Sequence, residues 1–494
     1  MRLLLIVLLL LTPLAAQAAD RIALVVGMAD YQTVVKLDNT ANDARGISTA
    51  LEKIGFQVTT LIDSTGNELR AAVEEFSFRS ETADLALIYF AGHGVEVQGE
   101  NFLIPVDADI KSNRDVQRQA ISLKELLAAV DHARKMRIVI LDSCRDNPFG
   151  DALDIAALEQ TAQAAEATRS AGSGGLAAPS PDRGTLVAFA ARDGEKALDG
   201  GKGGNSPFAQ ALMKNLPQPG LEISLMFRQV RDDVLAATYN RQEPHTYGSL
   251  PGTPFYVAGT AGTAIDSEQP SVAWSGLSPE QETRIAALAE EGNTRSMLSL
   301  AYMRLDKRGA RFDPQTAAQL LARAADAGDP EAMHQLARLY ETGDGVPQDP
   351  ARALELYQLS AAQEYPDALN DLGVLYFQGE LGLARDEPKA LDYFERAAAL
   401  RQKQAMYNFA SMIDDGRIPG KGPADAADLL YQSLRAGSRG VLDQMISNSR
   451  AFKPETRKAL QAKLADKGFY SGPVDGDFGP GTQRAIAAAF GLTD

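Results

Sequence analysis

Two apolar stretches, LALIYFAGHG at 85–94 and IVILDSCR at 138–145, decide the fold of this 494-residue chain. Both are strand-length runs of large apolar residues, the pattern of a strand that is buried on both faces of a parallel sheet. Between about residues 20 and 258 such runs alternate with amphipathic segments, which predicts an α/β domain with a mostly parallel sheet flanked by helices. His93 and Cys144, the only cysteine, each follow one of the two runs. Because the carboxyl ends of parallel strands share one edge of a sheet, we expect the imidazole and the thiol to meet there.

A cysteine beside a histidine is the minimum equipment for acyl transfer through a thioester. The imidazole takes the proton of the thiol, and the resulting thiolate is the nucleophile. His93 and Cys144 are therefore the candidate catalytic residues, with His93 relaying the proton to the leaving amine. Taken singly, each residue has a structural interpretation: Cys144 as a small buried hydrophobe, and Gly-His-Gly as a turn with a solvated histidine. Their joint position at two strand ends favours the catalytic dyad.

Further segments of the chain resemble caspase-like peptidases. These segments are RIALVVG at 21–27, LDNTANDA at 37–44, NFLIPVDA at 101–108, LDSCRDNPF at 141–149, TLVAFAA at 185–191 and NSPF at 205–208. His93 precedes Cys144 by 51 residues, which is similar to the spacing of about 50 in that family. Asp142-Ser143-Cys144 stands where animal caspases have Gln-Ala-Cys, and it resembles metacaspases and bacterial caspase homologues instead. The resemblance therefore does not imply cleavage after Asp.

The resemblance to metacaspases implies an acidic specificity pocket formed by Asp43 and Asp142. Two carboxylates beside the nucleophile suit a long cation, best an Arg held bidentately, so the expected cleavage follows Arg or Lys. The backbone N–H groups near Gly94 and Cys144 are expected to form the oxyanion hole. A structural alternative stays open for both acids, since Asp43 also suits a helix cap and Asp142 also suits loop amides.

The N-terminus and the composition bear on location. Residues 1–19 combine Arg2, an apolar core and Ala16-Gln17-Ala18, the pattern of a cleaved export signal, so we expect a periplasmic or secreted protein. One cysteine allows no intramolecular disulfide. The formal net charge of −16 opposes non-specific binding to nucleic acid or to anionic membranes. No later segment has the length of a membrane span.

The remainder of the chain divides by composition and repetition. Residues 150–183 interrupt the α/β pattern as a flexible insertion of the intersubunit type, and 259–288 have the Gly, Thr, Ser and Pro content of a linker. LARLYETG at 336–343 recurs as LGVLYFQG at 372–379, which predicts helix pairs over 289–437. These pairs resemble Sel1-like repeats, whose solenoid implies a surface for a protein partner, although a simple spacer would show the same helix-packing residues.

The last segment, 451–494, has two helical stretches around the turn YSGPVDGDFGP at 470–480. It resembles the small peptidoglycan-binding domains of envelope proteins. The turn defines no cofactor or metal site, because an EF-hand starting at Asp475 would need Glu where Ile486 stands. We therefore expect no cofactor; calcium activation stays open, but the sequence defines no site for it.

The sequence thus predicts an exported, caspase-like cysteine endopeptidase of metacaspase type, followed by a Sel1-like solenoid and a small helical wall-binding domain. Its partners would be a protein or peptide substrate, a protein on the repeats, and peptidoglycan. Two alternatives remain: a non-catalytic envelope scaffold that works through its repeats, and a murein-processing enzyme. The acidic pocket suits murein less well, although it could accept the amine of a stem peptide.

Overall fold

The computed structural model of the chain describes residues 21–144, 149, 184–192, 197–250, 255–258, 279–307 and 309–492. The signal peptide predicted at 1–19, the insertion predicted at 150–183 and the linker residues 259–278 lie outside the described residues. The chain divides into two compact units, one containing Ala19–Ala368 and the other containing Leu369–Glu380 and Ala384–Asp494.

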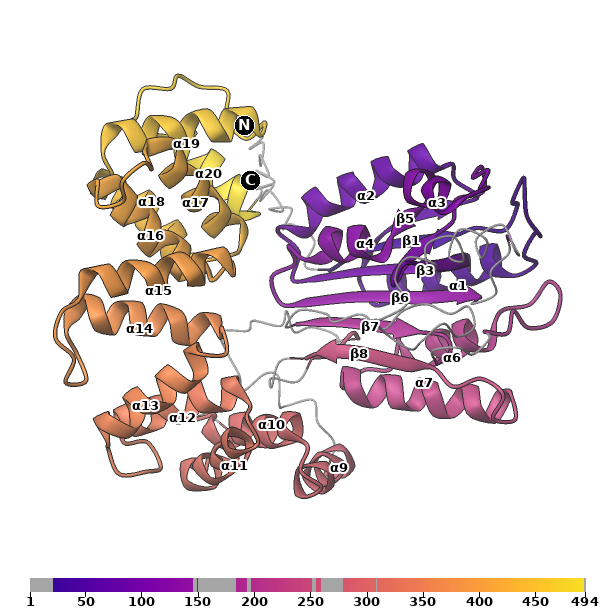
Figure 1. Cartoon of the computed structure of the whole chain (residues 1–494), viewed down its shortest axis with the longest axis horizontal. Helices are drawn as coiled ribbons and strands as arrows, with labels where there is room; N and C mark the ends of the chain where they lie inside the picture. The colour runs from indigo at the N-terminus through magenta and orange to yellow at the C-terminus, as the bar shows by residue number, and fades with distance from the viewer. Residues whose placement is uncertain are drawn as a thin grey trace, which may run out of the picture. The chain divides into compact units, whose positions relative to one another are not determined.

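A mixed, mostly parallel sheet forms the centre of the N-terminal domain (Figure 1). Its strands are β1 (Arg21–Gly27), β2 (Gln57–Ile62), β3 (Leu85–Val97), β4 (Glu100–Leu103), β5 (Ile121–Ser122), β6 (Met136–Cys144), β7 (Thr185–Phe189) and β8 (His245–Ser249). The order is β2-β1-β3-β6-β7-β8, and β8 runs antiparallel to β7. The apolar stretches at 85–94 and 138–145 lie in the neighbouring central strands β3 and β6, so the α/β prediction is confirmed.

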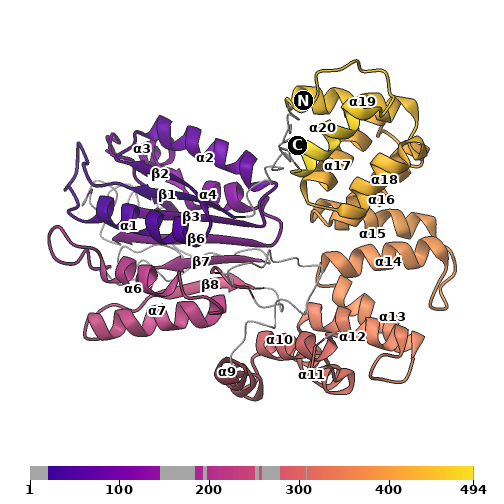
Figure 2. The same ribbon diagram turned by 180° about the vertical axis from the view of Figure 1, so that it is seen from behind.

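Each face of the sheet packs against its own set of helices. Ala86, Ile88 and Phe90 of β3 point into one core, and Leu87 and Tyr89 point into the other. The first core is covered by α2 (Gly66–Ser80), α3 (Asn113–Gln119) and α4 (Leu123–Val130), and the second by α1 (Thr40–Lys53), α6 (Pro207–Asn215) and α7 (Ile223–Ala237), as Figure 2 shows from behind. Burial on both faces explains why the central strands are continuously apolar.

Two helices, α1 and α6, begin near the carboxyl edge of the sheet, and local sequence fixes the start of α6. Ser206 is the N-cap of α6, where its Oγ accepts from the Ala209 N–H at 2.9 Å, and Pro207 occupies the first helical position. Helix α1 begins at Thr40 and carries Asp43 in its first turn. These starts place Asp43 and Ser206 at the edge where β6 ends.

Helix pairs follow the sheet domain. Their helices are α9 (Pro279–Glu290), α10 (Thr294–Leu305), α11 (Pro314–Asp326), α12 (Pro330–Thr342), α13 (Pro350–Ala361), α14 (Pro366–Gln378), α15 (Glu387–Ala399), α16 (Lys403–Asp415) and α17 (Pro423–Arg435). The predicted linker 259–288 needs correction in its last part, because helix α9 begins at Pro279. The reason is local: Pro279 takes the first helical position, and good helix formers follow it.

The C-terminal helices are α18 (Arg439–Ser447), α19 (Pro454–Asp466) and α20 (Pro480–Phe490), with a short 3-10 turn at Ser449–Ala451. Helices α19 and α20 each begin at a proline slightly before the helical stretches seen in the sequence. They share one compact unit with α17, because the buried Arg435 of α17 donates to the Ala489 carbonyl at 3.1 Å and lies over the Phe469 ring. The terminal segment is therefore packed on the last helix pair as well as on its own core.

Candidate active site

The strand register brings the backbones of His93 and Cys144 together. β3 and β6 are parallel, and His93 and Cys144 are directly paired at the end of their ladder. Cys144 is the last residue of β6, whereas β3 continues to Val97 and forms an antiparallel hairpin with β4. His93 therefore lies where β3 leaves the central sheet, and Gly94, predicted for the oxyanion hole, pairs with Leu103 in the hairpin.

The His93 ring is held from the loop after β1. Its Nε2 lies 2.8 Å from the backbone carbonyl oxygen of Val35. A carbonyl oxygen only accepts, so this contact assigns the proton of the neutral imidazole to Nε2 and the basic lone pair to Nδ1. Tyr31 packs against the ring with centroids 4.6 Å apart, and its hydroxyl accepts from the His93 N–H at 2.8 Å. His93 is thus a buried histidine with a defined orientation, whereas the sequence left a solvated turn open.

Asp43 and Asp142 are both buried, and both accept hydrogen bonds from the segment Asn205-Ser206. The Asp43 carboxylate accepts from the Asn205 amide at 2.9 Å and from the Ser206 N–H at 3.0 Å. The Asp142 carboxylate accepts from the Ser206 hydroxyl at 2.6 Å and from the Tyr89 hydroxyl at 3.0 Å. Ser206 therefore links the two acids that the sequence placed in one pocket.

Burial raises the pKa values of both acids. Desolvation, followed by the charge of Asp142, raises the pKa of Asp43 to about 7. Desolvation also raises the pKa of Asp142 to about 6, with the charge of Asp199 acting in the same direction, although the Ser206 and Tyr89 hydrogen bonds oppose it. The donors that reach both carboxylates are neutral, so they stabilise the anions without cancelling their charge.

A third acid, Asp199, belongs to this cluster. Burial raises its pKa, and its charge acts on Asp43, Asp142 and His93. Its backbone carbonyl accepts from the Asn39 amide, which holds it beside the start of α1. Within the described ranges, no Lys or Arg forms an ion pair with any of the three acids, while Lys202 pairs at 3.8 Å with Asp38.

Comparisons with known proteins identify domain families in three parts of the chain. Residues 20–256 match the caspase domain family. This part of the chain is a caspase domain. Three Sel1 repeats follow at 294–329, 330–365 and 366–401, and a peptidoglycan-binding domain matches residues 453–489.

Single relatives match only parts of the chain. The human mucosa-associated lymphoid tissue lymphoma translocation protein 1 is 31% identical over 140 residues, which are 28% of this chain and 17% of the relative. The structure of pro-sf-caspase-1 is 16% identical, with a TM-score of 0.36, over 50% of this chain and 93% of its own. A Sel1 repeat protein from Oxalobacter formigenes is 22% identical, with a TM-score of 0.32, over 42% of this chain and 54% of its own. A caspase domain implies a cysteine peptidase, and a peptidoglycan-binding domain points to the cell envelope.

The structure adds residues of the caspase domain that the sequence did not single out: Asp199, Asn205, Ser206, Tyr89 and the Val35 carbonyl. Ser206 and Asn205 had a usable signal, because Ser followed by Pro marks a helix start and their segment resembled the family. Val35 had no such signal, since a backbone carbonyl is independent of residue type.

In the described part of the chain, no group of three or more His, Cys, Asp or Glu side chains is placed to hold a metal ion. No helix among the described residues combines the length and the apolar composition that crossing a bilayer requires.

Proposed function

We propose that the caspase domain is a cysteine endopeptidase in which Cys144 is the nucleophile and His93 the base. The observation that carries this proposal is the direct pairing of His93 with Cys144, together with a ring whose Nε2 proton is engaged by Val35. That contact reserves Nδ1 for proton transfer. The orientation of the base is then set before the substrate arrives.

The reaction follows from these roles. The thiol proton passes to Nδ1 of His93, and the thiolate attacks the scissile carbonyl carbon. The C–N bond breaks as His93 returns the proton to the leaving amine, and a thioester remains on Cys144. Water, deprotonated by His93, then hydrolyses the thioester. The backbone N–H groups of Gly94 and Cys144 are proposed to stabilise the oxyanion in both steps.

The acid cluster supports cleavage after Arg or Lys. Asp43 and Asp142 are buried, their pKa values are raised, and they have no cation within the described residues. A substrate cation would supply the missing charge, and a guanidinium offers several donors to the two carboxylates and to Asp199. The raised pKa values imply that this preference strengthens with pH, because both carboxylates must be ionised to attract the cation.

Hydrolysis of a fluorogenic peptide library tests the assignment. We expect the wild type to cleave after Arg and Lys, and Cys144→Ala and His93→Ala each to lose about a thousandfold or more, with little further loss in the double variant. His245→Ala is the matched control, since His245 is an exposed histidine of the same domain. Full turnover in either dyad variant would refute the dyad. A folded wild type with no turnover would favour the scaffold alternative.

We also propose that residues 1–19 direct export and that the terminal domain holds the peptidase at the cell wall. Val474 of the terminal turn is 46% exposed, an apolar side chain available to a ligand. Val474→Ser should reduce co-sedimentation with purified peptidoglycan, whereas Leu400→Ser, a control at the similarly exposed Leu400 of the repeats (43%), should not. Equal sedimentation of all three proteins would remove the turn from the wall-binding proposal.

A further inference from the structure

The partner of the His93 ring is a carbonyl on an exposed loop, which raises the question of what fixes that loop. The loop runs between β1 and α1, and the Val35 side chain on it is 75% exposed. Its contribution to the site is therefore the backbone oxygen, 2.8 Å from Nε2 of His93. A loop carbonyl orients an imidazole only if the loop itself is held in place.

Asp63 holds the loop from the side of β2. It directly follows β2 and has a φ of 51°, a left-handed conformation that is uncommon for a residue other than Gly. This conformation accompanies two short hydrogen bonds, because one carboxylate oxygen accepts from the Ala29 N–H at 2.6 Å and from the Asp30 N–H at 2.8 Å. Bonds from backbone N–H groups to a carboxylate are charge-assisted and stronger than neutral ones. Asp63 therefore fixes the first turn of the loop.

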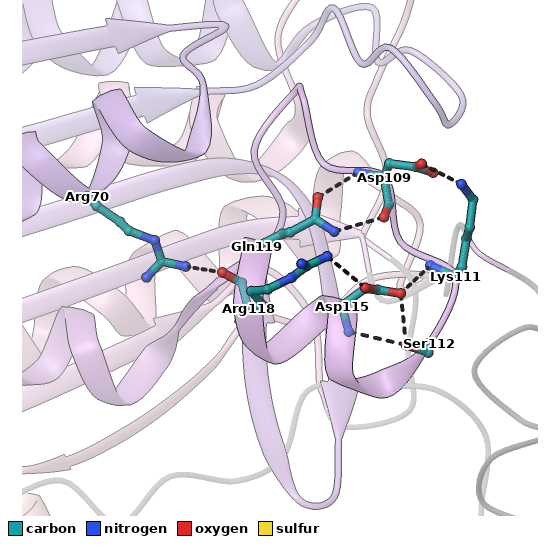
Figure 3. Close-up of polar contacts among 7 residues, drawn as sticks. All are labelled: Arg70, Asp109, Lys111, Ser112, Asp115, Arg118 and Gln119. Carbon is teal, nitrogen blue, oxygen red and sulfur yellow. Dashed lines mark hydrogen bonds and ion pairs between the residues drawn. The ribbon is translucent and has the colours of Figure 1, made fainter.

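The segment after β4 holds the loop from the other side. Three hydrogen bonds cross between them: the Tyr31 hydroxyl to the Ile104 carbonyl at 3.1 Å, the Gln32 N–H to the Val106 carbonyl at 3.0 Å, and the Thr33 hydroxyl to the Ala108 carbonyl at 2.6 Å. Beyond Ala108 the chain is held by further hydrogen bonds, as Figure 3 shows. The Gln119 amide accepts from the Asp109 N–H and donates to the Asp109 carbonyl, and the Asp115 carboxylate accepts from the Ser112 hydroxyl. The Val35 carbonyl is thus presented by a loop that is braced on two sides.

We propose that Asp63 is a positioning residue for His93. It keeps the loop turn that aims the Val35 carbonyl at Nε2, and so keeps the proton on Nε2 and the lone pair on Nδ1. Tyr31 is the second brace, because its hydroxyl joins the His93 backbone to Ile104. This inference rests on the proposed function for its kinetic consequence, but the state of the ring is measurable without a substrate.

The test compares Asp63→Ala, Asp63→Asn and Asp329→Ala in the full chain. Asp329, in the repeats, is the matched control, since one of its carboxylate oxygens also accepts from two successive backbone N–H groups, those of Glu331 at 3.0 Å and Ala332 at 3.1 Å. The chain has four histidines, so spectra of protein with 15N-labelled histidine are simple, and His93→Gln identifies the His93 signals. We expect the wild-type ring to show the Nε2–H tautomer at neutral pH. In Asp63→Ala we expect a mixture of tautomers and a loss of kcat/KM of about tenfold to a hundredfold.

The conservative variant and the control make the outcome decisive. Asp63→Asn keeps an acceptor oxygen and should retain both the tautomer and most of the rate, while Asp329→Ala should change neither. A wild-type ring in the Nδ1–H tautomer, or an unchanged His93 signal in folded Asp63→Ala, would overturn the positioning role even if the enzyme is active. A tautomer that responds to Asp63 in a protein without peptidase activity would instead refute the proposed function and leave the positioning role standing.

Discussion

Two buried carboxylates of this molecule have different partners for their negative charge. Glu331, in the repeat helix α12, is 3% exposed, and it receives a guanidinium from Arg295 at 2.9 Å and a hydroxyl from Tyr302 at 2.6 Å. Asp142, in the caspase domain, is 7% exposed and is reached by the hydroxyls of Ser206 and Tyr89. The acid in the repeats therefore has a counter-ion from its own chain, while the acid in the caspase domain has neutral donors and two further acids nearby.

The difference is the one expected between a structural acid and the substrate-binding acid that we propose Asp142 to be. Burying a carboxylate is costly, and an internal cation offsets much of that cost, as at Glu331. A cluster of buried acids with raised pKa values, and with no cation among the described residues, keeps this desolvation cost and attracts an incoming positive charge. The comparison thus predicts opposite results for matched Asp→Asn and Glu→Gln substitutions in the two regions.

The largest effect is expected from Asp142→Asn. The amide keeps an acceptor for the hydroxyl donors but removes the charge that would meet a substrate cation. Leaving one partner of a buried pair without its counter-charge costs about 2 to 5 kcal/mol, so kcat/KM for Arg substrates should fall by at least about thirtyfold. The measurement is the ratio of kcat/KM for matched peptides with Arg or citrulline before the cleaved bond. An unchanged ratio, or wild-type cleavage mainly after Asp, would contradict the pocket.

Glu331→Gln should show the reverse pattern. Arg295 loses its nearer carboxylate and keeps only the more distant Asp329 at 3.9 Å, so the free energy of unfolding of the repeat region should fall by about 1 to 3 kcal/mol. The Arg-to-citrulline ratio should stay at the wild-type value, because Glu331 belongs to the repeats. Chemical denaturation followed by circular dichroism measures the first quantity and peptide hydrolysis the second. A changed ratio in this variant would mean that the two regions are coupled.

Sequence and structure agree best where side chains and periodicity carry the information. The apolar runs predicted β3 and β6 as buried parallel strands. Because parallel strands bring their carboxyl ends together, the sequence alone predicted that His93 and Cys144 lie side by side, as their backbones do. The Ser–Pro pair at 206–207 carries a similar local signal for the start of α6, although no helix was predicted from it. Both signals rest on rules that act within one element or between neighbouring strands.

The remaining site contacts depend on tertiary structure. Asn205 and Ser206 reach Asp43 from more than 160 positions further along the chain, and no local pattern links them. The position of the Val35 carbonyl and the left-handed conformation of Asp63 are features of the backbone that many sequences could adopt. The predicted pocket acids were therefore placed close together, but the groups that bind and orient them were not identified.

The smallest predicted effect is a pH-dependent gain in stability from Asp43→Asn. The folded-state pKa of Asp43, about 7, lies above the ordinary aspartate value, so the folded protein holds this proton more tightly than the unfolded chain. The stability contributed by this group is complete below pH 4 and is lost as the pH rises through 7. Asn does not ionise, so the free energy of unfolding of the variant, relative to that of the wild type, should rise by about 1 kcal/mol or more from pH 5 to pH 8.

Asp115→Asn is a control of opposite sign. Hydrogen bonding from Ser112 lowers the pKa of Asp115, so removing that charge should lower the stability by a similar amount at pH 5 and at pH 8. Melting temperatures at the two pH values measure both variants. An Asp43→Asn effect that does not grow with pH would mean that the acid is solvated or paired with a cation in the folded protein, and the contrast with Glu331 would then disappear.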